Sequence, residues 1–248
     1  MQQTAAKNTP RYWQATRQPL ACLLFLLPLL SIYEAGVLWF GAAGAELVRN
    51  GADNWMRGAL VQLGFEQLYL LPVLVLGFFL LWQIWEGYPW RVSTPTLAGM
   101  CVESALFALG LVALSWIQEF FYQGWMAPTA QFVASGDPHA NLMLLVAFLG
   151  AGVYEEVLFR LGLLPVCYAL FRLFALPRTA SVVGAIVVTS AVFSWAHYVG
   201  PYADTFDTFS FLFRFLAGVV FASLFVFRGF GIAVGAHALY DIVVGILA

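Results

Sequence analysis

Long apolar segments dominate this chain and restrict its fold more than any other feature. A helix that crosses the hydrocarbon core of a membrane needs about 20 predominantly apolar residues, and several stretches of that length follow one another between short polar breaks. Hydrophobic residues make up 62% of the 248 positions and charged residues only 10%, against about 25% in soluble domains. Continuous runs such as 68–82 lack the alternation of a membrane β-strand. We therefore expect an all-α, polytopic bundle of transmembrane helices.

The apolar runs predict about seven membrane-spanning helices and one further helix at the interface. Segment 45–64 mixes aromatic and leucine residues with polar ones and is the candidate interfacial helix, whereas 119–139 is expected to be a loop. The run 140–174 would reach about 52 Å as one helix, which exceeds a hydrocarbon core of about 30 Å, so we expect a bend near Gly150, Gly152 or Pro165. The predicted spans are 19–40, 66–85, 96–117, 146–170, 180–198, 208–227 and 229–247.

The distribution of basic residues predicts the orientation in the membrane. Cytoplasmic loops are enriched in Lys and Arg, and with the N-terminus in the cytoplasm seven basic residues lie inside and two outside. The other two, Arg160 and Arg214, fall within predicted helices and need a local explanation. In this orientation His197 lies near the outer end of its span, so we expect an opening toward the outer half of the membrane. A net charge of -2 leaves no basic face for nucleic acid.

Ionisable residues inside the predicted spans point to function. Each costs about 2.5–3.5 kcal/mol at the centre of a membrane helix, so each needs a partner or a role. Glu34 and Glu103 stand alone, and we expect them to pair with other helices or to line a wet cavity. Glu156 and Arg160 are four residues apart in the order that favours a helical ion pair, and Glu155 points about 100° away from Glu156. Glu155 is therefore a candidate base facing a cavity, although an ion pair that locks two helices is an alternative for this segment.

Two histidines in later spans complete the candidate set. His197 follows Phe193 by one helical turn, and a hydrogen-bonded packing role is the alternative for a lone histidine. His237 and Asp241 are four residues apart and share one helix face, as a base and its orienting partner would, although a purely local hydrogen bond is the alternative. The three groups together, in a chain with three histidines, indicate one site.

These residue types suit the activation of water. A carboxylate can take a proton from water while an imidazole shares the hydrogen bond, and a second histidine oriented by Asp241 can donate to a developing oxyanion. The same set, Glu155, His197, His237 and Asp241, could instead ligate Zn²⁺ and generate a bound hydroxide, and the residues leave both options open. The H-E-x-x-H and G-x-S-x-G motifs are absent and no cysteine adjoins a histidine, which disfavours zincin, serine and thiol mechanisms.

The spacing resembles the CPBP family, which includes CAAX-prenyl endopeptidases and bacteriocin-processing or immunity-type membrane proteases. The resemblance rests on three motifs on successive helices and spans about residues 146–248, whereas 1–145 contain no recognised motif, so we expect an N-terminal transmembrane region followed by a catalytic core. The three motifs are E-E-x-x-x-R at 155–160, F-x-x-x-H at 193–197 and H-x-x-x-D at 237–241.

The resemblance implies a role for each motif residue. Glu155 would be the catalytic carboxylate and His197 its partner, with Glu156 and Arg160 in support. His237 and Asp241 would form the pair that stabilises the oxyanion. The family often has Asn at the last position, and because an ionised carboxylate cannot donate a hydrogen bond, Asp241 is expected to orient His237 or to contact a metal.

The resemblance also implies a membrane-anchored protein or peptide as the substrate, the lipid bilayer as the environment and a bacterial cytoplasmic membrane as the location. Two other classes remain possible from the residues alone. One is a non-catalytic immunity or scaffold protein that binds a peptide. The other is a proton-coupled transporter, since intramembrane Glu, His and Arg also build proton relays, although the paired repeats of many transporters are not evident.

Overall fold

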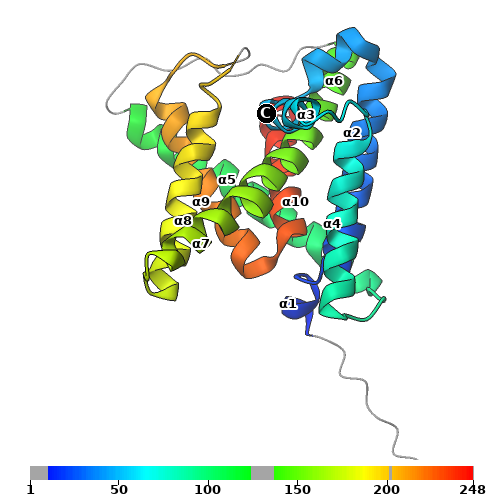
Figure 1. The fold of residues 1–248 in the computed structure, drawn as a ribbon. Helices are drawn as coiled ribbons and strands as arrows, with labels where there is room; N and C mark the ends of the chain where they lie inside the picture. The colour runs from blue at the N-terminus through cyan, green and yellow to red at the C-terminus, as the bar shows by residue number, and fades with distance from the viewer. Residues whose placement is uncertain (1–10, 124–136, 201–202, 248) are drawn as a thin grey trace, which may run out of the picture.

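A computed structural model describes residues 11–123, 137–200 and 203–247, and every regular element in these ranges is a helix. Six helical segments are long and apolar enough to cross a membrane, and they form the bundle in Figure 1. The predicted all-α transmembrane fold is therefore confirmed, although the predicted span at 66–85 corresponds to α4 (Leu70–Glu86), an apolar helix of only 17 residues. The six long segments are Pro19–Gly41 of α2, Thr94–Tyr122 of α5, Pro138–Leu173, α8 (Arg178–Ala196), α9 (Thr208–Arg228) and Phe230–Leu247.

Helix α10 (Phe230–Ile242) lies at the centre of the bundle. All nine residues from Phe230 to Ala238 are buried, and α10 contacts α5 (Thr94–Gln123), α9 and α2 (Pro19–Val48). Because lipid tails are as apolar as leucine, such helices associate through close packing. A Cβ added to Gly235 would lie 2.4 Å from Ser104 Oγ on α5, so this glycine allows the two helices to approach. His237 is consequently held in a buried and closely packed part of the fold.

The long helical run after 140, for which a bend is predicted, changes helix type along its length. The segment consists of α6 (Pro138–Gly150), two π-helical stretches, Ala151–Glu155 (η1) and Val157–Leu163 (η2), and α7 (Leu164–Leu173). π-helical turns are rare and occur mostly at functional sites, and here they include Glu155 and its neighbours.

Close packing accompanies this change of helix type. A Cβ on Gly150 would lie 2.2 Å from Tyr33 Cε2, and one on Gly152 would lie 2.7 Å from the Cβ of Ala238. The π-helical segment thus packs closely against both α2 and α10.

The prediction of a loop over 119–139 is wrong at both edges. Helix α5 continues to Gln123, and α6 begins at Pro138, where the side chain of Asp137 accepts a hydrogen bond from the His139 backbone at 3.0 Å. Proline at the first helical position and an aspartate cap favour this start. Residues 124–136 lie outside the described part of the chain.

The candidate interfacial helix of segment 45–64 corresponds to α3 (Gly51–Gln62). The side chain of Asn50 caps α3 by accepting a hydrogen bond from the Asp53 backbone N–H at 2.8 Å. In Figure 1, α3 lies at one end of the bundle and the short helix α1 (Tyr12–Ala15) lies at the other.

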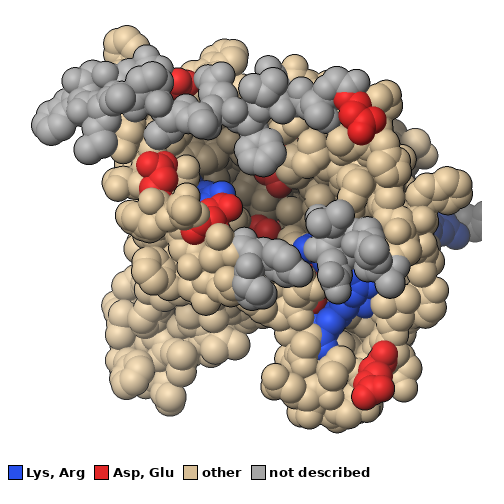
Figure 2. All heavy atoms as spheres, turned by 90° about the horizontal axis from the view of Figure 1, so that it is seen from above, with Lys and Arg blue, Asp and Glu red and all other residues tan. Residues whose placement is uncertain are grey.

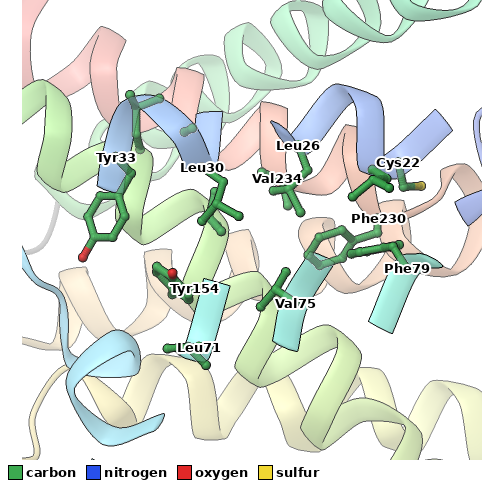
Figure 3. Close-up of a cluster of buried hydrophobic side chains, with 14 of the residues drawn as sticks. Cys22, Leu26, Leu30, Tyr33, Leu71, Val75, Phe79, Tyr154, Phe230 and Val234 are labelled. Atoms are coloured by element: carbon green, nitrogen blue, oxygen red, sulfur yellow. The ribbon is translucent and has the colours of Figure 1, made fainter. Parts of the chain in front are cut away.

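A cluster of buried side chains joins α2 and α4 to the central helix (Figure 3). Phe79 of α4 contacts Phe230 of α10 with ring centroids 5.2 Å apart, and the Tyr33 and Tyr154 rings meet edge to face at 5.4 Å. Tyr154 precedes Glu155, so this cluster fixes the backbone of the π-helical segment. The labelled members are Cys22, Leu26, Leu30, Tyr33, Leu71, Val75, Phe79, Tyr154, Phe230 and Val234.

The two isolated glutamates of the predicted spans are both paired, as expected. Glu103 accepts hydrogen bonds from Arg228 Nη2 at 2.7 Å and from the Tyr12 hydroxyl at 2.8 Å, close to α1. At the opposite end, Glu34 accepts from Arg57 Nη2 at 2.8 Å and from the Tyr154 hydroxyl. These contacts connect helices that are distant in the sequence.

Candidate active site

Three helices bring Glu155, His197 and His237 together. Glu155 is the last residue of η1, His197 follows α8 directly, and His237 lies on α10. Glu155 Oε2 is 3.8 Å from Nε2 of His197 and 3.8 Å from Nε2 of His237. This oxygen is buried and has no hydrogen-bond partner among the described residues, so an acceptor is directed at the space between the two imidazoles.

The neighbouring carboxylate, Glu156, orients His237 from the opposite side. Nδ1 of His237 lies 2.8 Å from Glu156 Oε1, and Glu156 Oε2 lies 3.1 Å from Arg160 Nε. Glu156 and Arg160 are 0% and 1% exposed, so each buried charge is compensated by the other. Asp241 Oδ2 lies on the other side of the ring, 3.5 Å from Nε2. Glu156 is therefore the partner of Nδ1, and Asp241, which the sequence suggested as the orienting partner of His237, lies near Nε2 of the same ring.

The tautomer of His197 follows from its hydrogen bond. Nδ1 lies 2.9 Å from the carbonyl oxygen of Phe193, and because a carbonyl can only accept, Nδ1 carries the proton. In the neutral ring Nε2 then holds a lone pair toward Glu155. The spacing F-x-x-x-H thus places the backbone acceptor one turn before the histidine.

Aromatic rings enclose the charged groups. The His237 ring is stacked on Phe221 with centroids 4.4 Å apart, and the Phe193 ring meets His197 edge-on at 5.1 Å. The Arg160 guanidinium lies 4.6 Å from the centre of the Phe193 ring, a distance suited to a cation–π contact. The rings therefore restrict the orientation of both imidazoles and limit access of water to the ion pair.

Two cavities meet at Glu155. The first, of about 440 Å³, extends between α6, α9 and α10, and the second, of about 730 Å³, extends toward α3 and the residues after α8. Asn50, Glu155 and His197 line both cavities. Figure 2 views the molecule from the end opposite α1 and shows a central hollow with acidic side chains inside it. The candidate site therefore opens at the end of the bundle away from α1.

The structure adds residues that the sequence analysis did not assign to the site. Arg214 lines the first cavity, and its Nη2 donates to Asp204 Oδ2 at 2.6 Å, which explains one of the two basic residues inside predicted spans. Asn50 lies in the segment expected to be interfacial, far from any motif. A weak signal for it is the sequence Asn50-x-x-Asp53, which is typical of a helix start.

The four possible zinc ligands are Glu155, His197, His237 and Asp241. Among the described residues, no three or more His, Cys, Asp or Glu side chains are grouped so that they could hold a metal ion. In this arrangement the four side chains do not form a metal site, and the carboxylate and imidazole groups of the chain are the groups available for chemistry.

Comparison with known proteins finds a family model that matches the part of the chain containing this site. Residues 137–243 match the model of the Rce1-like family, described as type II CAAX prenyl endopeptidase Rce1-like. No curated protein and no solved structure matches the chain. The matched range includes the three motifs at 155–160, 193–197 and 237–241, and the resemblance to CAAX-type proteases is confirmed. The chain is therefore an integral membrane protein whose residues 137–243 are similar to Rce1-like CAAX-type endopeptidases.

Proposed function

We propose that this protein is an intramembrane endopeptidase that hydrolyses a peptide bond in a membrane-anchored protein or peptide. The observation that supports this most strongly is the buried, unpartnered Oε2 of Glu155, which lies 3.8 Å from an imidazole Nε2 on each side. In the proposed catalytic set Glu155 and His197 activate water, His237 and Asp241 act on the oxyanion side, and Glu156 supports them with Arg160.

Glu155 and His197 form the base of the proposed mechanism. A water molecule between them donates one hydrogen to the Glu155 carboxylate and the other to Nε2 of His197, whose Nδ1–H is engaged with the Phe193 carbonyl. The lone pair of the oxygen is then free to attack the scissile carbonyl carbon. General-base assistance of this kind contributes about 10²–10⁴-fold to the rate.

His237 provides a donor for the developing oxyanion. Its Nδ1–H donates to Glu156, and Nε2 lies near the carboxylates of Glu155 and Asp241, which favours a protonated Nε2. This N–H donates to the carbonyl oxygen as that oxygen becomes negative. When the C–N bond breaks, the proton held by Glu155 passes to the leaving amine nitrogen. A preorganised donor of this kind is worth about 2.7–4 kcal/mol.

The cavity walls suit a substrate that is anchored in the membrane. Aromatic side chains from α6 and α9, including Phe148, Phe209 and Phe213, line the cavity of about 440 Å³ next to Glu155. We place the apolar part of the substrate there and the scissile bond at the junction with the second cavity. We further propose that residues 146–248 form the catalytic core beside the N-terminal region 1–145, in a bacterial cytoplasmic membrane with the N-terminus in the cytoplasm.

A direct test compares native protein with Glu155→Gln in proteoliposomes. The substrates are fluorogenic peptides of two kinds, one with a single apolar membrane segment and one with a farnesylated cysteine near a free C-terminus. We expect native protein to cut at least one kind and Glu155→Gln to cut neither. Glu66→Gln makes the same change at an exposed position and serves as the matched control. Equal cleavage by native protein and Glu155→Gln would contradict the proposal, and absence of cleavage by native protein across the panel would favour a peptide-binding role.

A further inference from the structure

The side-chain amide of Asn50 is a buried donor without a partner. Among the described residues, its Nδ2 makes no hydrogen bond although the atom is shielded from solvent. Leaving a buried polar group unsatisfied costs about 1–3 kcal/mol, so a ligand that fills this role is expected. Asn50 lines both cavities together with Glu155 and His197, so its side chain borders the same space as the two residues of the proposed base.

The cap of α3 determines which end of the amide is free. The backbone N–H of Asp53 donates to Oδ1 of Asn50 at 2.8 Å, and only the oxygen of a carboxamide can accept this bond. The NH₂ group is therefore the unpartnered end. The side-chain amide of Asn50 thus offers N–H donors to the cavity. A flip of the amide that exchanged Oδ1 and Nδ2 would break the hydrogen bond that caps α3.

A buried network holds this amide in place. Asp53 is 0% exposed and accepts hydrogen bonds from the Tyr33 hydroxyl at 2.7 Å and from Arg57 Nε at 2.6 Å. Burial lowers the pKa of Arg57, but Asp53 and Glu34 outweigh it and raise the pKa above its ordinary value, so the guanidinium stays charged. Because the groups around the start of α3 are fixed before any substrate binds, Asn50 is preorganised in the manner of an oxyanion donor.

Most other polar groups where the two cavities meet are hydrogen-bond acceptors, so a donor is required there. The Glu155 and Asp241 carboxylates accept hydrogen bonds when ionised, and the free Nε2 of His197 also accepts. A carbonyl oxygen that gains negative charge next to these groups requires donors. His237 supplies one from α10 in the proposed mechanism, and Asn50 is available from the α3 side of the cavities.

We propose that Asn50 is a catalytic residue whose side-chain NH₂ donates to the substrate carbonyl oxygen in the transition state. This inference rests on the proposed function. As water adds to the carbonyl carbon, the carbonyl electron pair moves to the oxygen, which accepts hydrogens from Asn50 and His237. No bond to Asn50 forms or breaks, and the C=O bond re-forms as the C–N bond breaks. One catalytic group would then come from the N-terminal region, outside the matched range 137–243.

Two substitutions separate the donor from the helix cap. Asn50→Ser and Asn50→Asp both keep an oxygen that can cap α3, but neither has an amide NH₂. With the same peptides in proteoliposomes, we expect kcat to fall about 10²–10³-fold in both variants, with KM within about threefold of native because the donor acts mainly in the transition state. We expect thermal unfolding to stay close to native, because the cap is retained.

Asn141 of α6 provides the matched control. It is not part of the lining of either cavity next to Glu155. Asn141→Ser and Asn141→Asp therefore repeat the same two chemical changes away from the junction of the cavities. We expect kcat within about threefold of native for both, since neither removes a donor from the junction.

The outcomes distinguish this inference from the proposed function. If Asn50→Ser keeps native kcat while Glu155→Gln is inactive, the role of Asn50 is wrong and the protease assignment stands. A rise in KM at constant kcat would also contradict a transition-state role. So would a loss of kcat that occurs only in a variant with a lower melting temperature than native protein. If native protein cuts none of the peptides, or Glu155→Gln cuts as well as native, both proposals fail together.

Discussion

Nδ1 of His237 lies 2.8 Å from Oε1 of Glu156, a residue 81 positions earlier in the chain. This contact joins the E-E-x-x-x-R motif to the last motif through a buried charge. Glu156 in turn contacts Arg160 at 3.1 Å, so one arginine stabilises the carboxylate that orients the imidazole. The paired glutamates thus have separate tasks, since Glu156 faces this network and Glu155 faces the cavities.

Replacement of Glu156 by Gln is predicted to destabilise the protein as well as to inactivate it. The change removes the charge that compensates Arg160, and leaving one member of a buried ion pair costs about 3–5 kcal/mol in soluble proteins. Thermal unfolding in detergent, compared with the exposed change Glu66→Gln, measures the effect. A melting temperature equal to that of native protein would show that Arg160 finds compensation elsewhere.

Replacement of Asp241 by Asn is predicted to keep kcat within about tenfold of native, whereas Asp241→Leu is predicted to lose about 10²-fold or more. The Asn Oδ1 can still accept from Nε2–H of His237, and its NH₂ adds a donor to the cavity, whereas Leu offers neither. Peptide cleavage by both variants gives the comparison. Loss of activity in Asp241→Asn alone would indicate that the negative charge itself is required.

Chelation is predicted to leave cleavage unchanged. The proposed mechanism uses carboxylate, imidazole and amide groups, and the described site residues are not grouped around a common metal position. The experiment dialyses purified protein against a strong zinc chelator, measures cleavage and metal content, and then adds Zn²⁺. Loss of activity that zinc restores would require a different arrangement of Glu155, His197 and His237 from the one described.

Replacement of Glu103 by Gln is predicted to lower stability without a change in catalysis. Glu103 pairs with Arg228 at the α1 end of the bundle, away from the cavities around Glu155. The loss of a charged hydrogen-bond partner is expected to cost about 1–3 kcal/mol, seen as a lower melting temperature. A fall in kcat at temperatures where the variant is folded would contradict the separation of this ion pair from the site.

The sequence predicted the helical membrane fold because length and hydropathy are local properties of each segment. It also predicted the Glu156–Arg160 contact, since a spacing of four residues places both on one helix face. The π-helical segment was not predicted, because it accompanies close contacts of Gly150 with Tyr33 and of Gly152 with α10.

Contacts between distant segments also could not be predicted from the sequence. The Glu156–His237 hydrogen bond and the position of Asn50 on the same cavities as Glu155 depend on how helices pack, and no spacing rule connects residues so far apart. The loop boundaries predicted at 119–139 were wrong because the polar residues at the end of α5 and at the start of α6 resemble those of a loop.

The central claim is that the Glu155 carboxylate activates water for peptide hydrolysis within the membrane. The most direct measurement is single-turnover cleavage of a membrane-anchored peptide in proteoliposomes by native protein, Glu155→Gln and the control Glu66→Gln, with both fragments identified by mass spectrometry. We predict that native protein and Glu66→Gln produce the two fragments at equal rates and that Glu155→Gln, folded to the same extent, produces neither. Cleavage by Glu155→Gln at the native rate would contradict the account.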